Sequence, residues 1–282
     1  MQTSGVFQTT KKLIEIKKLG EPITMIVFGD VHYGAPLHAT DKFNEFCAWA
    51  KQLPPSTLFL GMGDYLDFAS TSERGLLSRP EIHESTRATI DSMAHTLETE
   101  FMHKIDFMKG RLVGMLEGNH EWAHMDGTTT TMRLCQALRT EWLGVSAFIR
   151  LNFRYAGAYK PIDVFAHHGK GAARLVGGSL NRVQQMAEAA EADIYLMGHD
   201  HKRSVGVASK LYLDHKCSIK ERRQLFMRTG SFLKAYQKDT ASYIVDLAAS
   251  PSNLGSVRVM MTPHRPTAQG KKSFVVDLEA AV

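Results

Sequence analysis

The sequence predicts an α/β fold in which two β-sheets stack face to face and helices cover their outer surfaces. Short apolar runs alternate with amphipathic helical segments over the first two thirds of the 282 residues, and strand-like segments dominate after His201. Since each sheet must cover its apolar face, the two halves together favour stacked sheets. With 44% hydrophobic and 22% charged residues, the chain is expected to form one domain over residues 1–262. Residues 263–282 are expected to be an extension that completes or packs on that domain.

Five apolar runs predict the buried strands of the first two thirds. Each run is short and rich in β-branched or other apolar residues, as expected for strands that are covered on both faces. They are Ile23–Phe28, Thr57–Leu60, Leu112–Leu116, Ile162–Ala166 and Ile194–Met197. After His201, Gly, Pro, Lys or Asp residues separate further segments of strand-forming composition. These are Ser204–Leu213, Gln224–Arg228, Ser242–Ala248, Gly255–Met261 and Ser273–Leu278.

Three segments between the early strands have the apolar periodicity of amphipathic helices. Their apolar faces consist of Phe43, Phe46, Cys47, Ala50 and Leu53, then Ile90, Met93, Ala94, Leu97, Phe101, Ile105 and Met108, and finally Leu180, Val183, Met186 and Ala190. Residues 69–84 are the least regular stretch. Their polar composition predicts a loop beside the functional site.

The composition indicates a cytoplasmic protein that does not associate with membranes. The N-terminus lacks the pattern of a secretory leader, and no apolar stretch approaches the roughly 18 residues needed to span a bilayer. The three cysteines are an odd number without a CxxC pair, which suggests neither a disulfide framework nor a thiolate metal site. A net charge of +5 and a pI near 9.0 mildly favour polyanionic partners such as nucleic acid. The oligomeric state is left open.

Asp, Asn and His residues gather immediately after each of the five early strands. Since open α/β sheets bind ligands at the carboxyl ends of their strands, we expect the five clusters to converge on one crevice. Any one cluster alone is commonly a polar turn. Together they offer carboxylate, amide oxygen and imidazole without thiolate, a set that manganese, iron and zinc accept. The clusters are Gly29–His32, Gly63–Asp67, Gly118–Glu121, His167–Gly169 and Gly198–His201.

This ordered series resembles the signature of the calcineurin-like metallophosphoesterase superfamily, which is D-x-H, G-D-x-x-D, G-N-H-[DE], a histidine after a strand, and G-H-x-H. Every block is present in order, and the resemblance spans about residues 23 to 205. Five ordered blocks are far more specific than one short motif. The resemblance implies a four-layer α/β/β/α sandwich with two stacked mixed β-sheets and the metals at its edge.

The resemblance also implies two divalent metal ions, with manganese expected and iron or zinc as alternatives. Carried over position by position, it assigns one ion to Asp30, His32 and His201, the other to Asn119, His168 and His199, and the bridging position to Asp64. A carboxylate suits the bridge because its charge offsets two cations that lie about 3.5–4 Å apart. In the fourth block either His167 or His168 could face the metal, and His168, directly before Gly169, is preferred.

His120 is the expected catalytic residue, because the corresponding histidine of the superfamily does not bind metal. It would contact a phosphate oxygen or protonate the leaving oxygen, while hydroxide generated by the metals attacks phosphorus. A structural role in a turn is the alternative. Asp67 and Glu121 are expected to accept hydrogen bonds from imidazoles and so orient them.

One departure from the superfamily concerns substrate binding. Its protein Ser/Thr phosphatases carry a G-D-x-V-D-R-G block, and here Phe68 replaces the phosphate-binding arginine. Protein phosphatase activity is therefore not expected. Arg74, Arg79 or Arg174 could supply a guanidinium instead, but the sequence does not place them.

The sequence thus predicts a metal-dependent phosphoesterase that uses metal-activated hydroxide. Phosphodiesters, among them nucleic acids and nucleotides, are slightly favoured over monoesters because of the basic pI. A phosphomonoesterase acting on a small substrate is one alternative. A non-enzymatic scaffold is another, although such a protein would be expected to lose some ligands and this chain retains all of them. A Rossmann-type dinucleotide binder is excluded, because no G-x-G-x-x-G follows the first strand.

Overall fold

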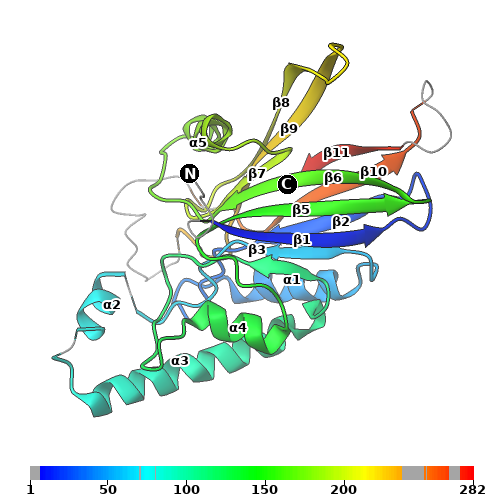
Figure 1. The fold of residues 1–282 in the computed structure, drawn as a ribbon. Coiled ribbons are helices and arrows are strands. Elements are labelled where there is room, and N and C mark those ends of the chain that lie inside the picture. The colour runs from blue at the N-terminus through cyan, green and yellow to red at the C-terminus, as the bar shows by residue number, and fades with distance from the viewer. Residues whose placement is uncertain (1–6, 70, 80, 237–250, 252, 267–273) are drawn as a thin grey trace.

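Two mixed β-sheets form the centre of the protein (Figure 1). The structure is a computed structural model, and it describes residues 7–69, 71–79, 81–236, 251, 253–266 and 274–282. Over this part of the chain, the first sheet has six strands in the order β1-β5-β6-β7-β9-β8, and the second has five in the order β11-β10-β2-β3-β4. Both contain parallel and antiparallel pairs. Figure 1 shows the two sheets stacked, with helices on the outer sides.

Among the described residues, the first sheet carries one helix on its outer face. Its strands are β1 (Gln8–Glu15), β5 (Ser146–Tyr155), β6 (Ala158–His167), β7 (Ile194–Met197), β8 (Arg203–Leu213) and β9 (Ile219–Thr229). Helix α5 (Val176–Ala189) covers β6, β7 and β9, because its buried residues Val183 and Met186 pack against Phe165, Tyr195 and Phe226. Strands β8 and β9 run on past the sheet as a two-stranded ribbon (Figure 1).

The second sheet carries three longer helices. Its strands are β2 (Ile23–Phe28), β3 (Leu58–Gly61), β4 (Leu112–Met115), β10 (Val257–His264) and β11 (Val275–Ala281), and its helices are α1 (Thr40–Lys51), α3 (Glu84–Ile105), which continues into the 3₁₀ turn η1 (Asp106–Met108), and α4 (Thr130–Leu138). The apolar stripe of α1 ends before Pro54, where a helix cannot readily continue. Phe43 of α1 and Phe101 of α3 are fully buried against Phe28 and Phe59 of the sheet.

A second, larger apolar core lies between the sheets. Val27 and Leu60 contribute from the second sheet, and Leu151, Val164 and Leu196 from the first, all of them inaccessible to solvent. The layers therefore follow the order α/β/β/α. This is the architecture that the resemblance to the calcineurin-like metallophosphoesterases implies, and the predicted fold class is confirmed.

Most expected elements are present, and the structure adds two strands and two helices to them. Residues 69–84 were expected to be a loop, and that expectation is wrong in part, because Thr71–Leu77 form helix α2. Strands β1 and β5 and helix α4 were not predicted from the sequence. The strand expected at 242–248 lies outside the described residues. The expected extension, residues 263–282, contributes the end of β10 and all of β11, which pair antiparallel.

None of the helices in the described part of the chain combines the length and the apolar character required to cross a bilayer.

Candidate metal centre

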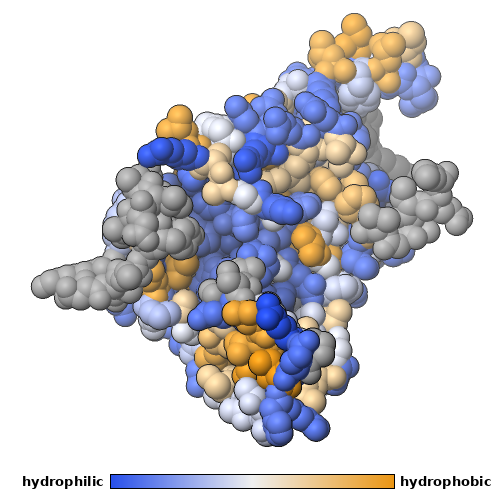
Figure 2. Space-filling model, turned by 90° about the vertical axis from the view of Figure 1, so that its left-hand side faces the viewer, coloured by the Kyte–Doolittle hydropathy of each residue, from blue (hydrophilic) through white to orange (hydrophobic). Residues whose placement is uncertain are grey.

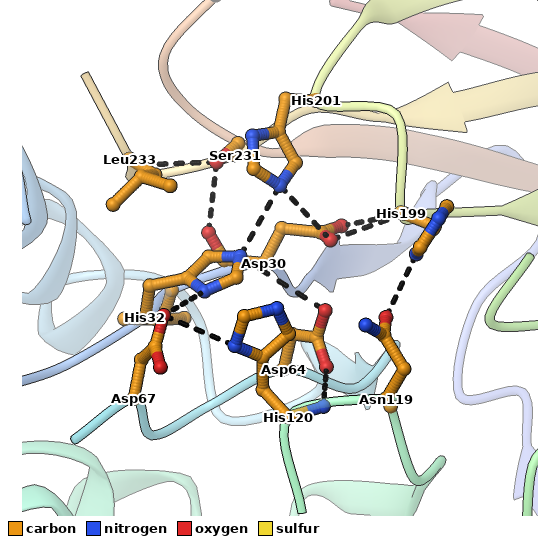
Figure 3. A network of polar contacts seen from close by, with 12 residues as sticks. Asp30, His32, Asp64, Asp67, Asn119, His120, His199, His201, Ser231 and Leu233 are labelled. Atoms are coloured by element: carbon orange, nitrogen blue, oxygen red, sulfur yellow. Dashed lines mark hydrogen bonds and ion pairs between the residues drawn. The ribbon is translucent and has the colours of Figure 1, made fainter. Parts of the chain in front are cut away.

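Five loops from both sheets converge at one edge of the sandwich. The loops after β2, β3 and β4 come from the second sheet, where these strands are parallel neighbours. Those after β6 and β7 come from the first sheet, where they too run parallel. Figure 3 shows side chains from the loops after β2, β3, β4 and β7 pointing toward one another. Figure 2 looks onto this side of the molecule and shows mainly hydrophilic residues in a hollow at its centre, with hydrophobic residues gathered below.

The backbone at this edge adopts an uncommon conformation at several expected ligands. In the described chain eight non-glycine residues have positive φ, and five of them are expected metal ligands: Asp30 (47°), His32 (50°), Asp64 (50°), His199 (74°) and His201 (57°). Left-handed conformations are unfavourable for residues with a Cβ atom and persist only where the surrounding structure enforces them. Their concentration in one place indicates that the loops are shaped to aim these side chains.

The first donor cluster consists of Asp30, His32 and His201, which are at most 9% exposed. The Nε2 atoms of His32 and His201 lie 3.2 Å apart, and His201 Nε2 is 3.6 Å from Asp30 Oδ1. The backbone N–H of His199 donates to both carboxylate oxygens of Asp30, at 3.1 and 3.0 Å. These bonds orient the carboxylate toward the two imidazoles.

The second donor cluster forms around the amide oxygen of Asn119. Asn119 Oδ1 lies 2.8 Å from His199 Nδ1 and 3.1 Å from His168 Nε2. His168 Nδ1 donates to the carbonyl oxygen of Met62 at 2.7 Å. This bond fixes the tautomer, since a carbonyl can only accept, and it leaves Nε2 to face the site.

His168, rather than its neighbour, faces this cluster. Its side chain is 1% exposed and its Nε2 lies 3.2 Å from Asp64 Oδ2. His167 instead accepts a hydrogen bond on Nδ1 from the backbone of Gly169 at 2.7 Å. The geometry therefore favours His168 among the two alternatives left open by the sequence.

Asp64 lies between the two clusters. Its Oδ2 is 3.2 Å from His168 Nε2 of one cluster and 3.9 Å from His32 Nε2 of the other. Its Oδ1 accepts a hydrogen bond from the backbone of His120 at 2.8 Å. A Cβ atom at Gly118 would collide with Asp64 Oδ1, and one at Gly63 would lie 2.6 Å from His168 Nδ1. The two glycines allow the loops to approach this closely.

Burial and mutual charge strongly shift the ionisation of these groups. Burial raises the pKa of Asp30 to about 8, opposed by the nearby His168. For Asp64, burial would raise the pKa, but His168 and His32 outweigh it and hold the pKa well below its usual range. Asp64 in turn affects His168: burial lowers the pKa of His168, but the negative charge of Asp64 outweighs burial and raises it to about 9. Burial also lowers the pKa of His201 and of His199.

These donors fit divalent cations. The Nε2 atoms of His32 and His201 face each other at 3.2 Å beside the carboxylates of Asp30 and Asp64, an arrangement that a cation between them would satisfy. The donor set of carboxylates, one amide oxygen and imidazoles suits manganese, iron or zinc. In the described residues, three groups of three candidate ligand atoms lie within 4.8 Å of one another: Asp30-His32-His201, Asp64-His168-His199 and His32-Asp67-His120.

Asp67 and His120 complete the site from the loops after β3 and β4. Asp67 Oδ2 lies 3.1 Å from His32 Nδ1 and 3.0 Å from His120 Nδ1. Burial would raise the pKa of Asp67, but its contacts with these two imidazoles hold it well below its usual range. The carboxylate thus orients both rings, as expected from the sequence.

Glu121 does not orient an imidazole, and that expectation is wrong. Its carboxylate accepts hydrogen bonds from the backbone N–H of Thr131 at 3.0 Å and from the hydroxyl groups of Thr130 and Thr131. It therefore joins the start of α4 to the loop after β4. The position of Glu121 directly after His120 in the sequence does not indicate that its side chain points toward α4.

Sequence reasoning missed two groups behind the ligands. The hydroxyl of Ser231, after β9, donates to the carbonyl oxygen of Asp30 at 2.9 Å. The carbonyl of Met62 holds His168. A lone serine and a backbone carbonyl carry no sequence signal for such a role.

No family model and no curated protein matches this chain. Among solved structures, it is similar to a conserved uncharacterized protein from Streptococcus pneumoniae TIGR4 that is described as a predicted phosphoesterase, with 13% identity and a TM-score of 0.32, covering 93% of this chain and 99% of that one. It is also similar to Vps29 of Chaetomium thermophilum, with 11% identity and a TM-score of 0.35, covering 92% and 95%. At these values the site must be interpreted from its own geometry.

Proposed function

We propose that this chain is a dinuclear metal-dependent phosphoesterase that hydrolyses phosphate esters and prefers phosphodiesters. The observation that carries the proposal is the position of Asp64, whose Oδ2 is 3.2 Å from a histidine of one donor cluster and 3.9 Å from a histidine of the other. A carboxylate shared in this way suits a pair of cations that clamp one phosphate.

The two ions would be held by the two donor clusters. One cation site comprises Asp30, His32 and His201, the other Asn119, His168 and His199, with Asp64 common to both. Manganese is the proposed metal, and iron or zinc would accept the same donors. Bound cations would activate water as the nucleophile and offset the negative charge that develops on the phosphate oxygens.

His120 is proposed to act on the substrate. Its side chain is 19% exposed, and its Nδ1 lies 3.0 Å from Asp67 Oδ2. With Nδ1 held by this carboxylate, Nε2 is the ring atom left to contact the phosphate or to protonate the leaving oxygen. Asp67 stabilises the imidazolium that donates the proton.

A basic loop beside the site supports a phosphodiester substrate, with nucleic acid as one candidate. Residues 169–175 follow His168, and Lys170 and Arg174 are exposed on this loop. Two further cations hold the loop in place: Arg182 donates to the carbonyl of Lys170 at 3.1 Å, and Lys202 to that of Ala173 at 2.6 Å. Positive charge at this position favours a polyanion such as nucleic acid, whose backbone links many phosphodiester groups. The three free cysteines support a cytoplasmic setting for the activity.

The test is hydrolysis of an aryl phosphodiester, an aryl phosphomonoester and single-stranded DNA after chelation and again after manganese is added. Wild type, Asp64→Asn and the control Asp277→Asn are compared, since Asp277 is an exposed residue of β11. We expect metal-dependent hydrolysis that is lost in Asp64→Asn and retained in the control. The diester should be cleaved faster than the monoester.

A faster monoester reaction would instead favour a phosphomonoesterase on a small substrate. Two bound metals without any hydrolysis would favour the scaffold. Failure of the wild type to bind any divalent metal would refute the proposal as a whole.

A further inference from the structure

Helix α2 places a buried arginine against the candidate metal centre. Arg74 is only 6% exposed although it lies on a seven-residue helix at the edge of the molecule. A guanidinium remains charged even when buried, so its burial is costly unless acceptors surround it. The hydrogen-bond acceptors around the Arg74 guanidinium therefore indicate the role of this side chain.

The acceptors around the Arg74 guanidinium include groups from two different loops. Nη1 donates to the carbonyl oxygen of Ala69 at 2.7 Å, and Nη2 donates to the carbonyl oxygen of Asn119 at 3.0 Å. Nη1 also forms an ion pair with Asp67 Oδ1 at 3.6 Å. Arg74 thus connects α2 with the loop after β3 and with the loop after β4.

Two of the residues that it contacts in those loops, Asn119 and Asp67, belong to the site. Asn119 offers its side-chain oxygen to the second donor cluster. Asp67 uses its other oxygen, Oδ2, to hold His32 and His120 through their Nδ1 atoms. The two oxygens of the Asp67 carboxylate therefore face different partners: Oδ1 faces the guanidinium, and Oδ2 faces the two imidazoles. Figure 3 shows the contacts of Asp67 with His32 and His120.

We propose that Arg74 is a positioning residue of the metal centre, which acts through Asp67 to orient His32 and His120 and through the Asn119 backbone to align the second cluster. This inference rests on the proposed phosphoesterase function for its catalytic consequence, but not for its effect on metal binding. A planar guanidinium is required because it reaches acceptors on two loops in fixed directions, which a lysine ammonium cannot do.

The first experiment measures manganese binding by calorimetry for wild type, Arg74→Ala and Arg74→Lys, with Arg79→Ala as the control. Arg79 lies five residues further on and is exposed. We expect Arg74→Ala and Arg74→Lys to lower manganese affinity by about 10- to 100-fold, as losses behind metal ligands do. Arg79→Ala should match the wild type. Thermal melts of the metal-free variants establish that each one is folded.

A double-mutant cycle with Asp67→Asn tests whether Arg74 acts through Asp67. We expect the effect of Arg74→Ala to be much smaller in the Asp67→Asn background, because the shared route is already broken. Added guanidinium ion at a concentration that does not unfold the protein should partly restore binding to Arg74→Ala and leave Arg79→Ala unchanged. A structural defect elsewhere would respond to neither.

The results for binding and catalysis separate the two proposals. If wild type binds manganese but cleaves no ester, the proposed function fails while the binding comparison still tests Arg74. If wild type is an active esterase, Arg74→Ala should lower kcat and leave KM nearly unchanged, since a positioning residue acts on the metal centre and not on the substrate. Unchanged manganese affinity in Arg74→Ala, or full additivity with Asp67→Asn, would overturn the inference.

Discussion

At the scale of single residues, the candidate ligands combine unfavourable backbone conformation with costly burial. Asp30, His32 and Asp64 all have positive φ and are at most 1% exposed. Such strain and desolvation are maintained only if the rest of the fold stabilises them, which is the usual situation at functional sites. The residue types of these positions could be predicted from the motif blocks. Their backbone conformation could not be predicted, because it depends on hydrogen bonds between loops. One example is the bond from the His32 N–H to the Asp64 carbonyl oxygen at 3.0 Å.

The roles of residues next to the ligands were harder to predict, since they depend on which way a side chain points. Asp67 and Glu121 both follow a motif block closely and both are acidic. Asp67 turns to the imidazoles of His32 and His120. Glu121 turns to two threonines at the start of α4, and α4 was not expected. The missing helix thus explains the wrong expectation for Glu121.

The adjacent histidines of the fourth block give a matched pair for mutation. His168→Ala should remove one ion, lowering its affinity by more than the roughly 10- to 100-fold that a contact behind a ligand contributes. His167→Ala should leave both affinities near the wild-type values and cost about 1 kcal/mol of stability, since it loses only the bond from Gly169. Manganese titration by calorimetry together with urea unfolding measures both effects. The opposite result for manganese would move the ligand role to His167.

At the scale of secondary-structure elements, the apolar patterns predict most of the strands and the longer helices, but four elements were not predicted. Strand β5 has buried Ala147, Ile149, Leu151 and Phe153 in strict alternation, a pattern that could have been recognised. Strand β1 is mostly exposed and polar, so only its pairing with β5 defines it. Helix α2 is too short for a periodic signal, and isolated helices of this length are not stable. The buried bonds of Arg74 help to hold it.

The start of α5 is an element whose stability can be improved. Its N-cap residue Leu175 has extended backbone, makes no capping hydrogen bond and is 74% exposed. Leu175→Ser should place a hydroxyl where it can accept a hydrogen bond from the first turn, raising the free energy of unfolding by about 0.5–2 kcal/mol. Urea unfolding measures this gain. Leu175→Ala is the control, because it removes the same exposed side chain without adding an acceptor, and equal stability of the two variants would contradict the prediction.

At the scale of the whole molecule, the stacking of two sheets brings the site together. Asp30, Asp64 and Asn119 follow strands of the second sheet, whereas His168 and His199 follow strands of the first. The large core between the sheets therefore determines how far apart the two halves of the site lie. The sequence predicts that five strand ends meet, since parallel neighbours end on the same side. It does not predict the spacing, which depends on packing between sheets.

The ionisation of Asp30 and His168 links the stability of the whole molecule to pH. Burial raises the pKa of Asp30 from 3.8 to about 8. Despite burial, Asp64 raises the pKa of His168 from 6.5 to about 9. Both groups bind their protons more tightly in the folded than in the unfolded chain, so their contribution to stability is present at lower pH and is lost as pH rises through 8 and 9. His199 and His201 act in the opposite direction, but their lowered pKa values confine that effect to pH below about 6.5.

Between pH 7 and 8.5, the metal-free protein should therefore lose stability as pH rises, whereas the manganese-loaded protein should not. Metal ions compete with these protons for Asp30 and His168, so manganese binds more tightly as the ligands deprotonate, and its binding free energy adds to the stability of the fold. The melting temperature with chelator should fall by a few degrees across this range, and the increase produced by excess manganese should grow. Thermal melts at closely spaced pH values measure both trends, and His168→Ala should flatten the metal-free profile. A metal-free melting temperature that is independent of pH, or a manganese effect that shrinks as pH rises, would contradict the assignment of these two residues to the metal centre.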